Sequence, residues 1–556
     1  MKLLIYQLLP RLYGNRNTNR QTDGTMAENG CGKMNDLTTA VLKQIAGMGI
    51  THVWLTGIIR HATQTDYSRY GIPSCHPAIV KGKAGSPYAI TDYYDVDPDL
   101  AVHVNQRMSE FEQLVERVHK AGMQVVLDFV PNHVARQYHS ICKPPRTKDL
   151  GQGDDPQQGF SPQNNFYYCP GERFTPYFDL YHGETEPYME EPAKATGNDQ
   201  FHNAPGRNDW YETVKLNYGV DYYAGRVGHF DPTPDTWKKM TDILMFWAAK
   251  GIDAFRCDMA EMVPAEFWAY ATAKVKKKYP AMLFIGEVYN PQEYRHYISS
   301  GFDLLYDKVG MYDTMRAVIC HQAPACAITG AWQATDDIRD HMLYFLENHD
   351  EQRIASDFFA GSGQKGVPAM IASVLMQQNP YMLYAGEEYG ERGMDKEGFS
   401  GHDGRTTIFD YWSIDTLCRA AWKTLTDDEQ RLYDMHKKVM TLARKEKAVS
   451  EGLFFDLMYV NAHLDRQYVF LRKAGKDLLL VAVNFDDRPV SIGINLPAHA
   501  FDFLGIPEKK VQATDLLNGT KHSLQLQKDG CLALQLDTRG GCVLKINCGT
   551  TTKKTV

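Results

Sequence analysis

Three features are absent or nearly absent from this sequence: a CxxC cysteine pair, a long apolar run and an excess of charge of one sign. Without closely spaced cysteine pairs, a zinc site of the common kind is not expected. No stretch approaches the ~20 apolar residues that a membrane span needs. Lys and Arg number 60 against 68 Asp and Glu, a formal net charge of −8, which disfavours a nucleic-acid partner because such proteins are usually basic.

The 11 cysteines are odd in number and scattered, so the sequence gives no sign of a disulfide framework and is more typical of a reducing compartment. Residues 1–11 resemble a signal peptide only superficially. Gln7 interrupts the apolar run, Arg11 ends it, and no small-residue cleavage site follows. We interpret this segment as a buried first strand and expect a cytoplasmic protein with no membrane partner.

What the chain does have is length and aromatic residues. At ~100–200 residues per domain, 556 residues allow three or four domains, or one large barrel with appendages. Phe, Trp and Tyr make up 12% of the chain, with 32 Tyr. A Tyr ring joins a flat apolar face to a polar tip, which suits a sugar surface, although extra core and interface aromatics explain the same excess.

Short apolar runs recur over residues 1–390, separated by helix-patterned segments such as 236–250. Continuous rather than alternating apolarity indicates strands buried on both faces, as in a parallel sheet. Strand–helix units in sequence predict an α/β fold, a (β/α)8 TIM barrel. The eight candidate strands are residues 3–9, 52–58, 124–130, 251–256, 283–288, 302–306, 342–346 and 381–384.

Two segments do not follow this strand–helix alternation. More than a hundred residues rich in Gly, Pro, Asn and Tyr follow the third strand, too long for an ordinary loop. From about residue 450 the pattern changes to short alternating strands, which predicts an antiparallel all-β domain with strands at 467–472, 477–484, 490–496, 532–537 and 541–546. We therefore divide the chain into a catalytic barrel of residues 1–133 and 236–449, an inserted domain of residues 134–235, and a C-terminal β domain of residues 450–556.

Charged and polar side chains stand where several predicted strands end, and in such barrels the catalytic groups lie at the carboxyl ends of the strands. A carboxylate at a buried strand end is costly unless it is paired or used. Any one of them could be a structural ion pair, but that explanation does not suit the whole set. The set comprises Asp258, Glu287 and Asp350, with Arg256, His133 and His349.

Paired carboxylates on one rim are what glycoside hydrolysis requires, one as nucleophile and one as acid. Asp258 and Glu287 end adjacent strands, the fourth and the fifth, which brings them near each other. A separation of about 5–5.5 Å leaves no room for an inverting water and is typical of retention of configuration.

Four segments around these residues resemble, in order, the signature regions of the α-amylase family, glycoside hydrolase family 13, as in its bacterial intracellular members. They are DFVPNH at 128–133, GIDAFRCD at 251–258, GEV at 286–288 and NHD at 348–350. The long insertion resembles that family's domain B and the β tail its domain C. Residues 215–219, KLNYG, resemble a fifth region near the end of domain B.

The resemblance implies a role for each residue. Asp258 would be the nucleophile, Glu287 the acid and then the base, and Asp350 a holder of sugar hydroxyls. Arg256, which we group with the substrate-binding residues, would keep the nucleophile ionised, and His133 and His349 would bind hydroxyls of the same ring.

The segment 85–94 resembles the family segment that supplies a stacking Tyr and a supporting Asp. Tyr88 would be the platform under the cleaved glucose. Asp92 would bind sugar, with turn capping as an equal alternative.

No metal ligand set is predicted. Many α-amylases carry Lys-His after the nucleophile and use the His carbonyl for calcium, whereas this chain has Glu261 and Met262 there. Asn132 matches a family calcium ligand, but no partner in the insertion is assured. We expect no required cofactor and leave a structural calcium ion open.

The predicted function is a retaining glycosidase that cleaves α-1,4 bonds of maltooligosaccharides or dextrins. A 4-α-glucanotransferase with the same machinery stays an alternative, as does a catalytically inactive carbohydrate-binding relative, which the retained carboxylates disfavour. The expected partner is an α-glucan or maltooligosaccharide. Chain-length and linkage preference, endo or exo action and the oligomeric state are left open.

Overall fold

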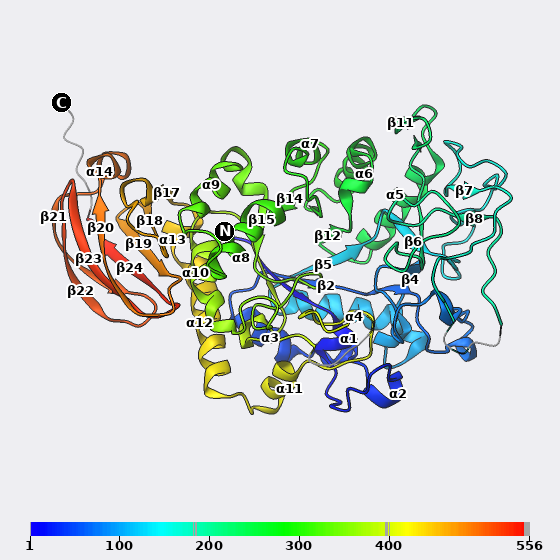
Figure 1. Cartoon of the computed structure of the whole chain (residues 1–556), viewed down its shortest axis with the longest axis horizontal. Coiled ribbons are helices and arrows are strands. Elements are labelled where there is room, and N and C mark those ends of the chain that lie inside the picture. The colour runs from blue at the N-terminus through cyan, green and yellow to red at the C-terminus, as the bar shows by residue number, and fades with distance from the viewer. Residues whose placement is uncertain (1, 182, 184–185, 395–398, 400, 550–556) are drawn as a thin grey trace.

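The protein is described by a computed structural model, which covers residues 2–181, 183, 186–394, 399 and 401–549. In Figure 1 the C-terminal sheets, orange to red, lie at one end of the long axis and the inserted strands at the other, with the barrel between them. The last seven residues of the predicted C-terminal domain, 550–556, lie outside the described residues.

Eight parallel strands close into a barrel, which confirms the predicted fold class. Each predicted apolar run contains or overlaps one barrel strand. In order around the barrel they are β1 (Leu4–Leu8), β2 (His52–Leu55), β5 (Gln124–Phe129), β12 (Ala254–Cys257), β13 (Leu283–Gly286), β14 (Leu304–Tyr306), β15 (Met342–Phe345) and β16 (Tyr381–Tyr384).

The strand register places the predicted catalytic pair side by side. Cys257 at the end of β12 pairs with Gly286 at the end of β13. The next residue along each strand is Asp258 on one and Glu287 on the other. Both side chains therefore leave the barrel at the same level of its carboxyl rim.

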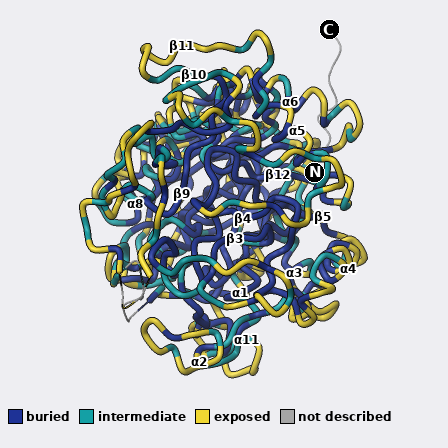
Figure 2. Tube along the Cα trace, turned by 90° about the vertical axis from the view of Figure 1, so that its right-hand side faces the viewer, coloured by how far each residue is buried: buried dark blue, intermediate teal, exposed yellow. Residues whose placement is uncertain are grey.

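The barrel strands are buried on both faces. Their inward side chains, among them Ile5, Trp54, Ile285 and Phe345, form a separate apolar cluster that fills the barrel. Their outward side chains pack against surrounding helices, and Figure 2 shows buried chain in the interior with exposed loops around it.

The helices follow the expected alternation with the strands. The helix predicted over residues 236–250 is α5 (Asp235–Ala248), which buries Trp237, Met240, Leu244 and Ala248. The others are α1 (Pro10–Tyr13), α2 (Met26–Asn29), α3 (Thr39–Gly47), α4 (Arg107–Lys120), α6 (Ala265–Lys278), α7 (Tyr294–Ser299), α8 (Asp313–Ile319), α9 (Ala327–Gln333), α10 (Val367–Leu375), α11 (Asp415–Trp422), α12 (Asp427–Lys445), α13 (Lys447–Ser450) and α14 (Ala498–Leu504).

Short two-stranded sheets lie outside the barrel, between β2 and α5 in the chain. One hairpin precedes the insertion, and three pairs lie between β5 and α5. The pairs are β3 (Ile59–His61) with β4 (Ile90–Val96), β6 (His133–Ala135) with β9 (Thr213–Lys215), β7 (Tyr168–Cys169) with β8 (Ala193–Lys194), and β10 (Val220–Asp221) with β11 (Val227–Gly228). The β6–β9 register sets Lys215 opposite His133.

The C-terminal part is antiparallel, as predicted. Five of its strands coincide with predicted ones, and β17, β21 and β22 were not predicted. Helix α14 also interrupts what was expected to be all β. A six-stranded sheet contains β17 (Leu453–Asp456), β18 (Gln467–Ala474), β19 (Asp477–Asn484), β24 (Gly541–Asn547), β21 (Lys509–Asp515) and β22 (Lys521–Leu526), and β20 (Val490–Leu496) pairs with β23 (Gly530–Leu536).

All 11 cysteines are free thiols, in agreement with the absence of a predicted disulfide framework. Within the described residues, no helix has both the length and the apolar character that crossing a membrane requires.

Arg472 on β18 fastens the C-terminal sheet to the barrel. Its side chain is 1% exposed and donates to three backbone carbonyls, those of Met376 at 2.8 Å, Ala448 at 2.8 Å and Val449 at 2.6 Å. Met376 follows α10, and the other two carbonyls belong to α13. One buried guanidinium thus joins a strand of the sheet to two helices.

We predict that Arg472→Met lowers the free energy of unfolding by about 2–4 kcal/mol, because three buried carbonyls lose their donor. Urea unfolding followed by circular dichroism measures the change. The control is Arg488→Met, whose guanidinium is 80% exposed in the same part of the chain and should change stability by no more than about 0.5 kcal/mol. Equal effects of the two substitutions would contradict the anchoring role.

Candidate active site

A cavity of about 330 Å³ opens at the carboxyl rim of the barrel. This volume lies near the lower end of the ~300–1,000 Å³ typical of small-molecule sites. The predicted residues that line it are Asp258, Glu287, Asp350, Tyr88 and His133. Arg256, His349 and Asp92 are not among its lining residues, and each of these three has a different position.

Arg256 lies beneath the cavity and is completely buried. Its Nη1 donates to Asp258 Oδ1 at 2.8 Å and to Asp128 Oδ1 at 3.0 Å, and its Nη2 donates to Glu287 Oε2 at 2.8 Å. Arg256 was predicted among the substrate-binding residues, but its donors are directed at carboxylates. It acts on substrate only by holding the groups that reach the cavity.

Glu287 is fixed at both carboxylate oxygens. Besides Arg256, Oε2 accepts a hydrogen bond from the backbone N–H of Met259 at 2.7 Å. Met259 has a φ of 43°, the left-handed region that costs a non-glycine residue of order 1 kcal/mol. Oε1 accepts from the Tyr289 hydroxyl at 2.5 Å, and Tyr289 lines the cavity.

The electrostatics of Asp258 reflect its crowded surroundings. Burial raises its pKa well above the ordinary aspartate value, Arg256 opposes that rise, and the charges of Glu287, Asp128 and Asp350 add to it. Arg256 is therefore the group that favours the ionised form of Asp258.

Asp350 and His349 follow β15 together. Asp350 leaves 42% of its side chain exposed, and its Oδ2 lies 3.0 Å from His349 Nε2. His349 is 2% exposed and is held between the Gln7 amide, 2.7 Å from Nδ1, and the Tyr88 hydroxyl at Nε2. Burial lowers the pKa of His349 to about 3, so the ring is neutral near pH 7. The structure therefore places His349 behind Asp350 and Tyr88 rather than in the cavity wall.

Tyr88 and His133 both reach the cavity, as predicted for sugar-binding side chains. The Tyr88 ring stacks on His349 with centroids 5.3 Å apart, and its hydroxyl donates to Asp128 Oδ2 at 2.9 Å. Burial lowers the pKa of His133 to about 3, with the charges of Lys215 and Lys81 acting in the same direction.

Asp92 is not brought to the cavity. It is fully buried, and its carboxylate accepts from the Ser140 hydroxyl at 2.5 Å and from the backbone N–H groups of Ile141 at 2.8 Å and Cys142 at 3.0 Å. It also lies 3.5 Å from Arg60. We therefore correct its assignment as a substrate-binding residue, because loop and guanidinium donors occupy its oxygens.

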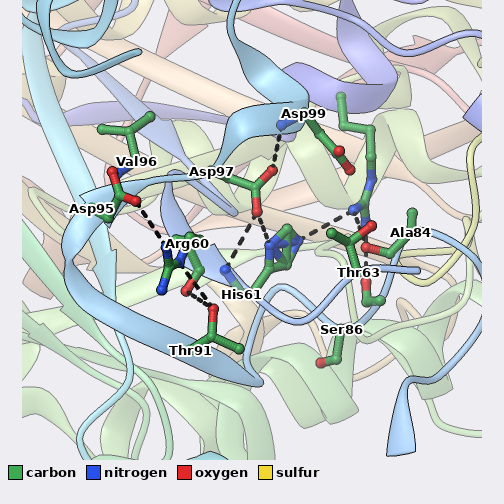
Figure 3. A network of polar contacts seen from close by, with 12 residues as sticks. Arg60, His61, Thr63, Ala84, Ser86, Thr91, Asp95, Val96, Asp97 and Asp99 are labelled. Carbon is green, nitrogen blue, oxygen red and sulfur yellow. Dashed lines mark hydrogen bonds and ion pairs between the residues drawn. The ribbon is translucent and has the colours of Figure 1, made fainter. Parts of the chain in front are cut away.

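The hairpin that carries Tyr88 and Asp92 rests on a buried polar network, shown in Figure 3. Arg60 pairs with Asp95 at 3.2 Å, and His61 pairs with Asp97. Asp92, Asp95 and Cys142 lie close enough to form a candidate metal group, but arginines already pair with both carboxylates. This network therefore stabilises the fold of the chain beside the cavity.

Several cavity residues were not predicted. Tyr289 stands two residues beyond Glu287, and that spacing was the one available signal. Lys81, Trp210, Glu212, Met259 and Phe409 also line the cavity. Most of these lie in loops that carry no periodic pattern. Lys81 and Glu212 form an ion pair at 2.9 Å across two such loops.

Glu261, which stands where many α-amylases carry Lys, has a structural role in this chain. Its Oε2 accepts from the backbone N–H groups of Tyr289 at 2.9 Å and Asn290 at 3.0 Å. Glu261 follows Asp258, whereas the two N–H groups follow Glu287. The carboxylate therefore ties the loop after β12 to the loop after β13.

Comparison with known proteins agrees with this geometry. Residues 7–439 match the family model of the α-amylase catalytic domain, so the chain belongs to the α-amylase family. It is 23% identical over 468 residues to α-amylase MalA of Haloarcula japonica, covering 83% of this chain and 53% of that protein. It is 22% identical over 448 residues to an α-1,4-glucan:maltose-1-phosphate maltosyltransferase of Cereibacter sphaeroides, covering 79% and 54%.

The chain thus spans about half the length of these two curated relatives. Among solved structures, an α-amylase from Geobacillus thermoleovorans in complex with acarbose aligns with a TM-score of 0.64 at 20% identity, covering 100% of this chain and 99% of that one. The matched family model and the closed eight-stranded barrel thus agree that this chain is a member of the α-amylase family.

We predict that Glu287→Gln separates substrates by their leaving groups. Hydrolysis of maltooligosaccharides should fall by about 10²–10⁴-fold, the usual contribution of a general acid. α-Maltosyl fluoride needs no such protonation, so fluoride release should show a burst followed by slow turnover. Asp258→Asn is the matched control and should lose both reactions. Equal losses of the two substrates in Glu287→Gln, with no burst, would contradict the assignment.

We also predict that protonation of Asp258 limits kcat/KM on the acid side of the pH profile. Because its pKa is raised, this group takes up a proton as the pH falls through a value above the ~4 of an ordinary aspartate. The ratio kcat/KM should therefore decline on the acid side from a pH above about 4. Initial rates with α-maltosyl fluoride across pH, with retained fold checked at each pH, measure this limb. A limb centred at or below about pH 4 would contradict the raised pKa.

Proposed function

We propose that the protein is a retaining hydrolase that cleaves α-1,4-glucosidic bonds of maltooligosaccharides or related dextrins by double displacement. The observation that carries this proposal is the attachment of Asp258 and Glu287 to the two terminal nitrogens of one buried guanidinium, Arg256, each at 2.8 Å. Two carboxylates held on one planar group, at the ends of adjacent strands, suit the close spacing of a retaining pair.

In the proposed first step, an Asp258 oxygen attacks C1 of the sugar while the bond from C1 to the leaving oxygen breaks. Glu287 gives its proton to that oxygen, and the sugar becomes an ester of Asp258. In the second step Glu287 takes a proton from water, the water oxygen bonds to C1, and the ester bond breaks. Each displacement inverts C1, so the product keeps the α configuration.

The rest of the cavity supports a sugar as substrate. The rings of Tyr88, Trp210, Tyr289 and Phe409 offer flat apolar faces, and Asp350 has an exposed carboxylate that can accept hydrogen bonds from hydroxyls. Contacts of Asp350 that strengthen as the ring distorts would stabilise the transition state selectively.

A transglycosylase is the second candidate, favoured by the similarity to a maltosyltransferase. The covalent step is the same in both cases, and a sugar hydroxyl rather than water would open the ester.

For the compartment, we propose the cytoplasm, supported by the free state of all 11 cysteines.

Digestion of maltoheptaose, followed at early times by proton NMR and by chromatography, tests this function. We expect shorter sugars only, with the new reducing end appearing first as the α-anomer. Longer sugars among the products would favour the transglycosylase, and unchanged maltoheptaose would favour a non-catalytic binding protein. An initial β-anomer would contradict double displacement.

A further inference from the structure

The ammonium group of Lys215 is enclosed by oxygen atoms at the junction of the insertion and the barrel. Its side chain is 2% exposed, and Nζ lies 2.5 Å from Asn132 Oδ1 and 2.7 Å from a carboxylate oxygen of Asp199. The backbone carbonyl of Met262 lies 3.4 Å away. These oxygens come from three segments that are far apart in the sequence.

Each of the three segments borders the active site. Asn132 stands three residues after the end of β5 and directly before His133, and Met262 stands four residues after Asp258. The loop that carries Asp199 packs closely against His133. A Cβ atom added at Gly197 of this loop would lie only 2.9 Å from the His133 Cβ atom. The Asn132 amide donates to the Gly197 carbonyl at 2.7 Å, which closes the arrangement.

This arrangement bears on calcium, because Asn132 and the carbonyl at position 262 are the two places where the family resemblance implied a calcium ligand. Calcium binds oxygens at about 2.3–2.6 Å and takes 6–8 of them. Lys215 Nζ already lies that close to Asn132 Oδ1, and Asp199 is the one carboxylate among the oxygens described around Nζ. A calcium ion therefore does not fit beside the ammonium.

We propose that Lys215 is a positioning residue that supplies, from the chain itself, the positive charge that joins the insertion to the loops bearing His133 and Asp258, so that this junction needs no metal ion. Lys215 pairs with one oxygen of Asp199, and the guanidinium of Arg226, 69% exposed, lies 3.6 Å from the other. Carbonyl and amide oxygens complete the coordination without further carboxylates.

The test compares Lys215→Met with Lys239→Met. Lys239 is a second buried lysine of the same junction, whose Nζ donates to the Asp149 carbonyl at 2.7 Å and to Asn165 Oδ1 at 2.8 Å. Neither of those partners lines the cavity. Both variants lose a buried ammonium, so both should have a lower Tm. Only Lys215→Met should lower kcat, by about 10–100-fold, because small displacements of catalytic groups have effects of this size.

Melting and activity of the wild-type protein are measured after exhaustive chelation and after return of calcium. We expect both to stay unchanged. A fall in wild-type Tm or activity that calcium specifically restores would overturn the proposal. So would a kcat of Lys215→Met within about threefold of wild type, or an equal kcat loss in Lys239→Met.

If Lys215→Met does not fold, Lys215→Gln takes its place, and the chelation measurement stands on the wild-type protein alone. The kcat comparison rests on the proposed function, whereas the response of Tm to chelation does not. A protein that fails to cleave maltoheptaose but keeps its Tm without calcium would therefore refute the function and leave this inference standing.

Discussion

The buried guanidinium of Arg256 is the interaction on which the rest of the site depends. A charge without solvent is costly unless it is paired and hydrogen-bonded, and Arg256 has three carboxylates around it, on Asp128, Asp258 and Glu287. The rings of Trp54 and Tyr306 lie 5.1 and 5.6 Å from it. Its strand, β12, stands between β5 and β13, so the barrel order itself brings the three carboxylates together.

The loops around this centre are held by charged groups as well. Glu261 joins the loop after β12 to the loop after β13, and Lys215 joins the insertion to both the segment after β5 and the loop after β12. Preorganised groups of this kind need no rearrangement during the reaction, which is where electrostatic catalysis gains most. The insertion thus contributes to the position of the catalytic groups although it supplies neither carboxylate of the pair.

The sequence predicted the barrel and its carboxylates because both follow from strong local patterns, continuous apolar runs and the polar residues that end them. It did not predict β21 and β22, whose Lys, Gln and Ser residues mask a half-buried alternation. The substrate-binding role of Asp92 could not be judged from the sequence, because motif similarity carries no information on burial. Its neighbour on the paired strand is Arg60. Lys81 and Glu212 meet only through tertiary folding, so no local spacing marks them.

The central claim is that Asp258 carries the sugar between two displacements, and peptide mass spectrometry tests it most directly. The Glu287→Gln variant is mixed with α-maltosyl fluoride, stopped during the burst of fluoride release and digested at low pH. The account predicts one maltosyl group, as an ester on the peptide that contains Asp258. A maltosyl ester on Asp350 or on any other residue, or fluoride release in a burst with no labelled peptide, would contradict it.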